Sequence, residues 1–229
     1  MGITNPRTWG PFVYAYELTK FDYPFQVSWS QGGEDIGLGM VFRGMKNGRY
    51  VDVGAHHPSR FSVTRKLRAT GWTGINIDAN PELIAAFEKD RPDDINLWNC
   101  IGNQPQYEFT VFKDPAISTV NKDWRKKFLG LNQEIESELI VPGRPLHDVF
   151  SRYFGDGYPD LLCIDAEGAD LDVLTSARLS KGLGPEWLLL EADPPLSNIV
   201  RTPAVEYALS LGYEVHLILG MSTLLHKNP

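Results

Sequence analysis

Several acidic residues follow short apolar segments, each at a point where a buried strand would end. The segment Tyr50-Val51-Asp52-Val53-Gly54-Ala55-His56-His57 carries an acid and then a glycine turn, and Gly74-Ile75-Asn76-Ile77-Asp78 ends on a second acid. Parallel strands present their carboxyl ends at one edge of a sheet, where ligands bind. Glycine lets the backbone approach a ligand closely, and a carboxylate can accept hydrogen bonds from both hydroxyls of a ribose. We therefore expect a nucleoside pocket at this edge.

The residues after Gly54 limit which nucleotide cofactor could bind. A dinucleotide fold needs the glycine-rich pattern G-x-G-x-x-G to cradle a pyrophosphate, but Ala55, His56 and His57 follow Gly54. The missing glycines disfavour a nicotinamide-dependent oxidoreductase. A cofactor with a ribose and no pyrophosphate fits better, and S-adenosylmethionine is such a cofactor.

Two further acid pairs follow later strand candidates. Asp165 and Glu167 come after one apolar run, and Glu191 and Asp193 end another. With Asp52 and Asp78, four strands would bring acids to one rim, where repulsion must be relieved by a cation, a ligand amine or protonation. Asp165, Glu191 and Asp193 could form an oxygen-rich Mg²⁺ site, although their spacing does not require one. Alternatively, Glu167 and Asp193 only cap the turns or helices that follow.

The order of strand and helix patterns predicts an α/β fold. Alternating apolar segments and helical periodicity predict a doubly wound, mostly parallel seven-stranded sheet with an antiparallel edge strand. The strands are expected at 49–53, 73–78, 95–101, 161–165, 187–191, 213–219 and 223–226. Helices are expected near 30–42, 63–70, 81–89, 146–154, 171–178 and 203–211.

Two segments depart from this alternation. Residues 1–29 are rich in aromatic side chains and are expected to form an arm packed on a single domain of residues 30–229. Residues 104–145 are expected to form an insertion over the pocket, with strands near 107–112 and 138–141, that carries acceptor specificity. The basic cluster Trp124-Arg125-Lys126-Lys127 is either a solvated helix face or a clamp for an anionic acceptor.

Composition excludes several classes of protein. The formal net charge of −7 argues against general nucleic-acid binding, which favours a basic surface. No apolar run approaches the roughly 20 residues that span a bilayer, and the N-terminus lacks the apolar core of a secretion signal. Cys100 and Cys163 lie in apolar runs, which is typical of reduced core cysteines. These features predict a cytoplasmic protein. The oligomeric state is not indicated.

Five motifs together resemble the FkbM-type methyltransferases, which are class I S-adenosylmethionine-dependent enzymes. They are Ser30-Gln31 with Gly33-Glu34-Asp35, Val51 to Ala55, Ser62 with Thr64, Gly71-Trp72 with Gly74 to Asp78, and Ile164 to Gly168. The resemblance implies O-methylation of a sugar hydroxyl in a glycan, a nucleotide sugar or a glycosylated natural product. Another small-molecule acceptor, or a non-catalytic cofactor-binding partner in a glycan-assembly complex, remains an alternative.

The resemblance also implies roles for individual residues. Asp52, Gly54 and Ala55 would line the methionine end of the cofactor with Ser62 near its carboxylate, and Glu34 would meet its amino group or the acceptor. The ribose and adenine would be held by Asp78, Ala79, Cys100 and Ile101. The segment carrying Asp165 and Glu167 would face the transferred methyl group. A sugar hydroxyl needs a base or a metal to favour the alkoxide. The candidate bases are His56, His57, Asp165 and Glu167, although His56 stands where family members often have asparagine.

Overall fold

The central element of the fold is a seven-stranded sheet in the order β3-β2-β1-β7-β8-β10-β9. The structure is a computed structural model that describes residues 27–191 and 202–228. The strands are β1 (Arg49–Val53), β2 (Thr73–Asp78), β3 (Ile95–Trp98), β7 (Leu161–Ile164), β8 (Trp187–Glu191), β9 (Tyr213–Leu219) and β10 (Ser222–Lys227). All adjacent pairs from β3 to β8 are parallel, and β10 is antiparallel to both β8 and β9. The predicted fold class is therefore confirmed, with the antiparallel strand one position inside the edge strand β9.

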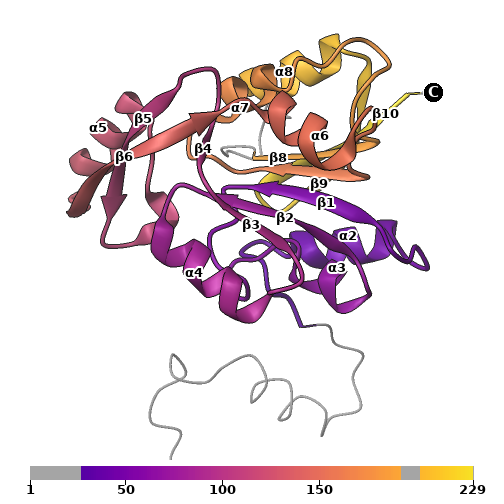
Figure 1. Cartoon of the computed structure of the whole chain (residues 1–229), viewed down its shortest axis with the longest axis horizontal. Coiled ribbons are helices and arrows are strands. Elements are labelled where there is room, and N and C mark those ends of the chain that lie inside the picture. Colours follow the sequence, from indigo (N-terminus) through magenta and orange to yellow (C-terminus); the bar gives the residue numbers. More distant parts are fainter. Residues whose placement is uncertain (1–26, 192–201, 229) are drawn as a thin grey trace, which may run out of the picture.

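Helices cover both faces of this sheet (Figure 1). They are α2 (Glu34–Val41), α3 (Arg65–Ala69), α4 (Pro81–Asp90), α6 (Leu146–Phe154), α7 (Asp170–Ser176) and α8 (Pro203–Ser210). Figure 1 shows α2, α3 and α4 below the sheet and α6, α7 and α8 above it. Because side chains alternate along a strand, β1 contributes Val51 and Val53 to the core under α6, α7 and α8, and Tyr50 to the core on the α2 and α3 side.

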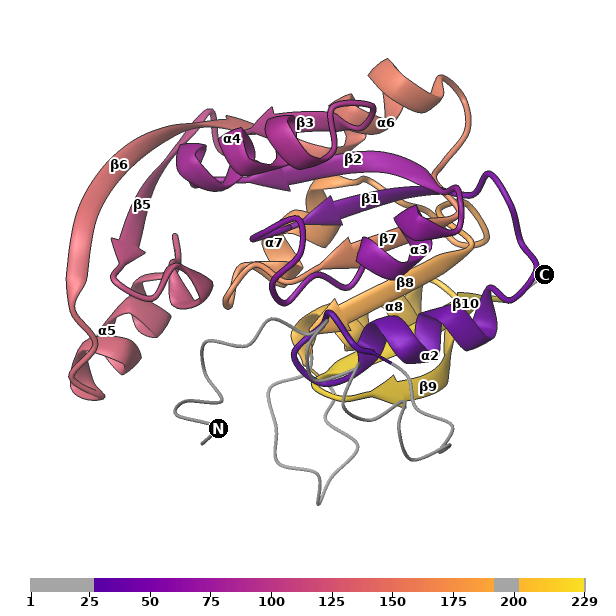
Figure 2. The same ribbon diagram turned by 90° about the horizontal axis from the view of Figure 1, so that it is seen from below.

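A second, three-stranded sheet projects beyond the main one (Figures 1 and 2). It has the order β4-β6-β5 and consists of β4 (Cys100–Ile101), β5 (Gln106–Phe112) and β6 (Ile135–Arg144). The short helix η2 (Pro115–Ile117) and helix α5 (Lys122–Gly130) connect β5 to β6. The segment predicted as an insertion, residues 104–145, thus supplies most of this sheet, and its polar middle part forms α5.

One predicted strand is divided between the two sheets. The sequence suggested a continuous strand over 95–101, but the chain leaves the main sheet after Trp98 and enters the small sheet at Cys100. Asn99 donates its backbone N–H to the carbonyl oxygen of Asp78 over 3.2 Å. The continuous strand was wrong because apolar periodicity does not specify which partner strand each residue pairs with.

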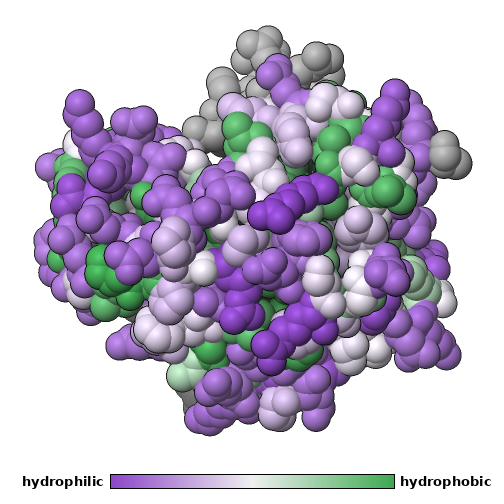
Figure 3. Space-filling model, turned by 45° about the horizontal axis from the view of Figure 1, so that its top comes forward, coloured by the Kyte–Doolittle hydropathy of each residue, from purple (hydrophilic) through white to green (hydrophobic). Residues whose placement is uncertain are grey.

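Hydrophilic residues cover most of the face of the molecule seen in Figure 3. Hydrophobic residues form small separate groups on this face. Among the described residues, every helix is too short or too polar to traverse a bilayer. The predicted arm, residues 1–29, falls almost wholly outside the described residues.

Candidate active site

A cleft of about 1080 Å³ opens at the carboxyl edge of the main sheet, facing the small sheet. A cleft of this kind is large enough for a small-molecule ligand. The walls come from the ends of β1, β2, β7 and β8, from the small sheet, from the start of α2 and from the turn between β9 and β10. The sequence-predicted residues that line it are Glu34, Gly54, His56, Asp78, Ala79, Cys100, Ile101, Asp165, Glu167 and Glu191.

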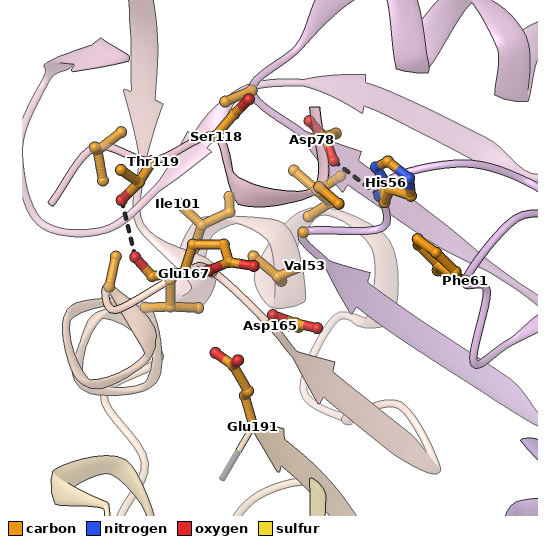
Figure 4. A pocket seen from close by; sticks show the side chains of 18 of the residues that line it. Val53, His56, Phe61, Asp78, Ile101, Ser118, Thr119, Asp165, Glu167 and Glu191 are labelled. Atoms are coloured by element: carbon orange, nitrogen blue, oxygen red, sulfur yellow. Dashed lines mark hydrogen bonds between the residues drawn. The ribbon is translucent and has the colours of Figure 1, made fainter. Parts of the chain in front are cut away.

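Asp78 closes one end of the cleft at the end of β2 (Figure 4). Its Oδ2 atom accepts the backbone N–H of His56 over 2.9 Å, and its Oδ1 atom accepts that of Asn80 over 2.8 Å. Burial raises the pKa of the Asp78 carboxyl to about 6, while these two backbone donors oppose the rise. Each carboxylate oxygen can accept more than one hydrogen bond, so Asp78 keeps acceptor capacity for a ligand.

Apolar groups adjoin Asp78. Ala79 follows it directly, and Cys100 and Ile101 of β4 line the same part of the cleft. Burial raises the pKa of the Cys100 thiol to about 12, so the thiol stays neutral at physiological pH. This combination of a carboxylate and an apolar surface suits a ribose attached to a flat purine ring.

Asp52 does not reach the main cleft. It precedes Val53, and strand alternation places the two side chains on opposite faces of the sheet. Asp52 is buried and accepts the hydroxyl of Thr64 over 2.9 Å, and burial raises its pKa to about 6. The predicted acid rim therefore loses one member, which the period-two pattern of β1 could have revealed.

Ser62 belongs to the same buried network as Asp52. The guanidinium of Arg91 donates to Ser62 Oγ over 2.9 Å, to Thr64 Oγ1 over 3.0 Å and to the carbonyl oxygen of Pro58. Ala55, another predicted residue outside the main cleft, is buried and lines a smaller cavity of about 340 Å³ that Asp52 shares. The hydrogen bonds of Arg91 hold the loop after β1 in place.

Three carboxylates gather at the other end of the cleft (Figure 4). Asp165, Glu167 and Glu191 each place one oxygen within 4.8 Å of the others. The predicted metal set was Asp165, Glu191 and Asp193. Asp193 lies outside the described residues, and Glu167 joins the other two because it follows β7 in a left-handed turn with φ of 47°.

The electrostatics of this group differ from those of an ordinary surface acid. Asp165 is exposed to the cleft, but the surrounding walls remove much of its hydration, and this desolvation raises its pKa to about 7. The carboxylates of Asp170, Asp52 and Glu34 add to the rise, whereas a hydrogen bond with Glu191 opposes it. Asp165 therefore changes protonation near neutral pH, which suits a general base.

Glu34 connects α2 with the far end of the sheet. Its Oε2 atom accepts the backbone N–H of Gly32 over 2.9 Å, and its Oε1 atom accepts that of Met221 over 3.2 Å. Met221 lies in the turn between β9 and β10. Two backbone donors thus hold the Glu34 carboxylate at the edge of the cleft.

The two adjacent histidines have different surroundings. His57 Nδ1 accepts the backbone N–H groups of Ser59 and Arg60, each over 3.0 Å, so it shapes the loop after β1. The ring of His56 stacks on Phe61 beside Asp78, and neither of its nitrogens has a partner among the described residues. Burial lowers the pKa of His56 to about 4. A base that weak, beside Asp78, fits ligand contact better than proton abstraction.

Other cleft residues were not predicted as site residues. Gln31 belongs to a motif noted in the sequence, but residues from the small sheet and the hairpin turn had no local signal. The cleft residues outside the predicted set include Phe61 and Val63 from the loop after β1, Asn99 between β3 and β4, Phe109, Ser118, Thr119 and Val120 from the segment of the small sheet, and Met221 and Ser222 from the β9–β10 hairpin.

Two solved structures align with most of the chain at low sequence identity. The search of curated proteins gave no match. A TehB-like SAM-dependent methyltransferase from Corynebacterium glutamicum aligns at 12% identity over 98% of this chain and 100% of its own, with a TM-score of 0.44. A precorrin-6y C5,15-methyltransferase from Geobacter metallireducens aligns at 15% identity over 91% of this chain and 95% of its own, with a TM-score of 0.43.

A family model is more informative than these structures. The model described as the methyltransferase FkbM domain matches residues 52–197, which is more than half of the chain. The matched region contains the strand ends that carry Gly54, Asp78 and Asp165. The chain therefore belongs to the FkbM family of S-adenosylmethionine-dependent methyltransferases.

Proposed function

We propose that the protein transfers the methyl group of S-adenosylmethionine to a hydroxyl of a carbohydrate acceptor. The observation that supports this most directly is the placement of Asp78 and Asp165 at opposite ends of one cleft. One end suits a nucleoside, and the other offers carboxylates where a hydroxyl could be deprotonated.

The cofactor would lie along the edge of the sheet. Asp78 would accept the ribose hydroxyls, while Ala79, Cys100 and Ile101 would contact the adenine. Gly54 and Glu34 border the path toward the acid group and would accompany the methionine part. This arrangement would direct the sulfonium toward Asp165 and Glu167.

Methyl transfer would follow from alignment together with proton removal. The acceptor oxygen would attack the methyl carbon in line while the carbon–sulfur bond breaks, so positioning of the acceptor by the protein would supply much of the rate. Asp165 would take the hydroxyl proton, because a base with a pKa near 7 combines availability with sufficient basicity. The carboxylate of Glu167 would accept a hydrogen bond from the acceptor or help retain the proton.

The acid group also offers a place for a divalent cation. Asp165, Glu167 and Glu191 are the described residues that could hold Mg²⁺, and their oxygen donors suit that ion. A bound cation would act as a Lewis acid toward a hydroxyl. Turnover that survives EDTA would leave the assignment to Asp165 intact, whereas loss restored by Mg²⁺ would assign activation to the ion.

We further propose that residues 104–145 carry the acceptor specificity. Ser118, Thr119 and Phe109 of this segment line the cleft. Hydroxyl and aromatic groups suit the polar edges and apolar faces of a sugar ring. The basic residue Arg125 of α5 pairs with Glu138 over 2.8 Å, which favours a solvated helix face over a clamp for an anionic acceptor.

The free, buried cysteines Cys100 and Cys163 support a reducing, cytoplasmic location.

An acceptor panel tests the proposal. The purified protein is incubated with S-adenosylmethionine and neutral oligosaccharides, nucleotide sugars, glycosylated small molecules or sugar-free phenols, and S-adenosylhomocysteine is measured. We expect product only with sugar-bearing acceptors and a mass increase on the sugar. Transfer to sugar-free acceptors alone would contradict the carbohydrate assignment. Tight cofactor binding without turnover on any acceptor would favour the non-catalytic alternative.

A further inference from the structure

The loop that carries Glu167 has an unfavourable backbone conformation. Glu167 and Gly168 are consecutive residues with positive φ, 47° and 88°. Glycine tolerates this region, but a residue with a side chain is disfavoured there unless its surroundings hold it. The surroundings of Glu167 should therefore contain the groups that hold it.

Those groups come from the segment that leads into α5. The hydroxyl of Thr119 donates to the carbonyl oxygen of Glu167 over 2.8 Å, and Asn121 Nδ2 donates to the carbonyl oxygen of Gly168 over 2.7 Å (Figure 4 shows the first bond). The indole of Trp124 lies so close to Gly168 that a Cβ atom there would overlap it. Two hydrogen bonds and one aromatic contact from this segment thus hold the turn, beside the bond that Asp170 Oδ1 accepts from the backbone N–H of Ala166 over 3.1 Å.

The two donor residues are themselves anchored. Thr119 is buried and exchanges backbone hydrogen bonds with Thr110 of β5, over 2.9 and 3.1 Å. Asn121 donates its backbone N–H to Thr119 Oγ1 over 2.8 Å, and its Oδ1 atom caps α5 by accepting the backbone N–H of Asp123 over 2.9 Å. The small sheet therefore provides a rigid support for the turn.

We propose that Thr119 and Asn121 are positioning residues that hold the Glu167 carboxylate toward the methyl-donor sulfonium. Neither side chain needs to touch the reacting atoms, since each acts on the backbone that carries Glu167. The inference rests on the proposed function, because it takes the acid end of the cleft as the sulfonium end. On this proposal, the segment of the small sheet would both contact the acceptor and support the turn that carries Glu167.

Charge provides a readout that needs no acceptor. S-adenosylmethionine carries a positive sulfonium, whereas S-adenosylhomocysteine has a neutral thioether and otherwise the same contacts. A nearby carboxylate favours the cation, and the preference falls as the separation grows. The dissociation constant of S-adenosylhomocysteine divided by that of S-adenosylmethionine therefore reports where the Glu167 carboxylate lies. A general loss of packing changes both constants together and leaves this ratio unchanged.

The experiment measures both ligands by calorimetry on the full chain. Glu167→Gln removes the charge. Its ratio should be lower than that of the wild type by about tenfold or less. Thr119→Val removes the hydroxyl at nearly constant volume and should shift the ratio in the same direction. Thr119→Ser restores the donor and should recover the wild-type ratio. In the Glu167→Gln background, Thr119→Val should change the ratio no further.

A second variant covers the case in which Thr119→Val fails to fold. Asn121→Ser keeps a side-chain oxygen that can cap α5 but removes the N–H donor to Gly168 without adding a charge, so it should also lower the ratio. If the wild-type protein binds neither ligand, the proposed function fails. If both ligands bind and these variants leave the ratio unchanged, or Glu167→Gln does so, the positioning role is overturned while the proposed function stands.

Discussion

The backbone of Gly54 packs directly against the carbonyl oxygen of Asp165, so that a Cβ atom at Gly54 would overlap this oxygen. Gly54 also has a φ of 77°. The two residues follow neighbouring strands, β1 and β7, which pair in parallel. This contact fixes the loop after β1 relative to the segment that carries Asp165, and glycine is required there for a contact within the protein.

Replacing Gly54 by alanine should destabilise the protein strongly. The positive φ alone disfavours alanine by about 1–2 kcal/mol, and the overlap with Asp165 adds to it, for a total above about 3 kcal/mol. Gly44→Ala is a matched control, because Gly44 has a φ of 85° but nothing within 4 Å of its Cβ position. Chemical denaturation should show a loss of only about 1–2 kcal/mol for the control. Equal losses would contradict the close contact.

Removing the Asp78 carboxylate should weaken cofactor binding. Asp78→Ala should raise the dissociation constant of S-adenosylhomocysteine at least about tenfold, because a hydrogen bond to a charged group contributes about 1.5–3 kcal/mol. Asp52→Asn changes another buried acid whose side chain lies outside the main cleft, so it should bind normally. Calorimetry measures both variants. An affinity lost in Asp52→Asn and kept in Asp78→Ala would reverse their assignments.

Asp165 should control turnover while leaving the affinity for the neutral S-adenosylhomocysteine nearly unchanged. With an acceptor identified, Asp165→Asn should reduce methyl transfer by about 10²–10⁴-fold, the usual contribution of a general base. For the wild type, kcat/KM should rise with pH and level off above about 7, the pKa to which desolvation in the cleft raises Asp165. A methyl-release assay across pH tests both points, and retained turnover in the variant would remove Asp165 from the catalytic residues.

The buried Asp52 should make stability depend on pH. Its folded-state pKa of about 6 lies above the ordinary value of 3.8, so its stabilising contribution is complete below about pH 4 and is lost as pH rises through 6. Relative to the wild type, Asp52→Asn should therefore gain up to about 3 kcal/mol in free energy of unfolding between pH 4 and pH 8. Asp156→Asn, at an exposed position, should show no such trend. Denaturation curves at both pH values provide the measurement. If the stability of Asp52→Asn relative to the wild type changed with pH no more than that of Asp156→Asn, the prediction would be refuted.

Much of the fold follows from local patterns in the sequence. The strands at 49–53, 73–78, 187–191 and 213–219 and the helix at 146–154 begin and end where periodicity predicts. Strand alternation and helical periodicity reflect one-sided burial, which each segment shows in its own residues. The acids after the strands were visible for the same reason, since Asp78, Asp165 and Glu191 each end an apolar run.

Contacts between distant segments were not predictable in this way. The break at Asn99 depends on a hydrogen bond to Asp78, and the support of Glu167 depends on Thr119 and Asn121 from another sheet. His56 became a neighbour of Phe61 and Asp78 only because the loop after β1 folds back on itself.

The sequence by itself determined the sheet, the family and the acids that approach its carboxyl edge, because each depends on residues close together in the chain. The tertiary structure decided which acids share the cleft. It turned Asp52 to the opposite face, brought Glu167 beside Asp165 and Glu191, and placed the small sheet against them. The physical reason is that side-chain direction and desolvation depend on packing between segments, which no single segment encodes.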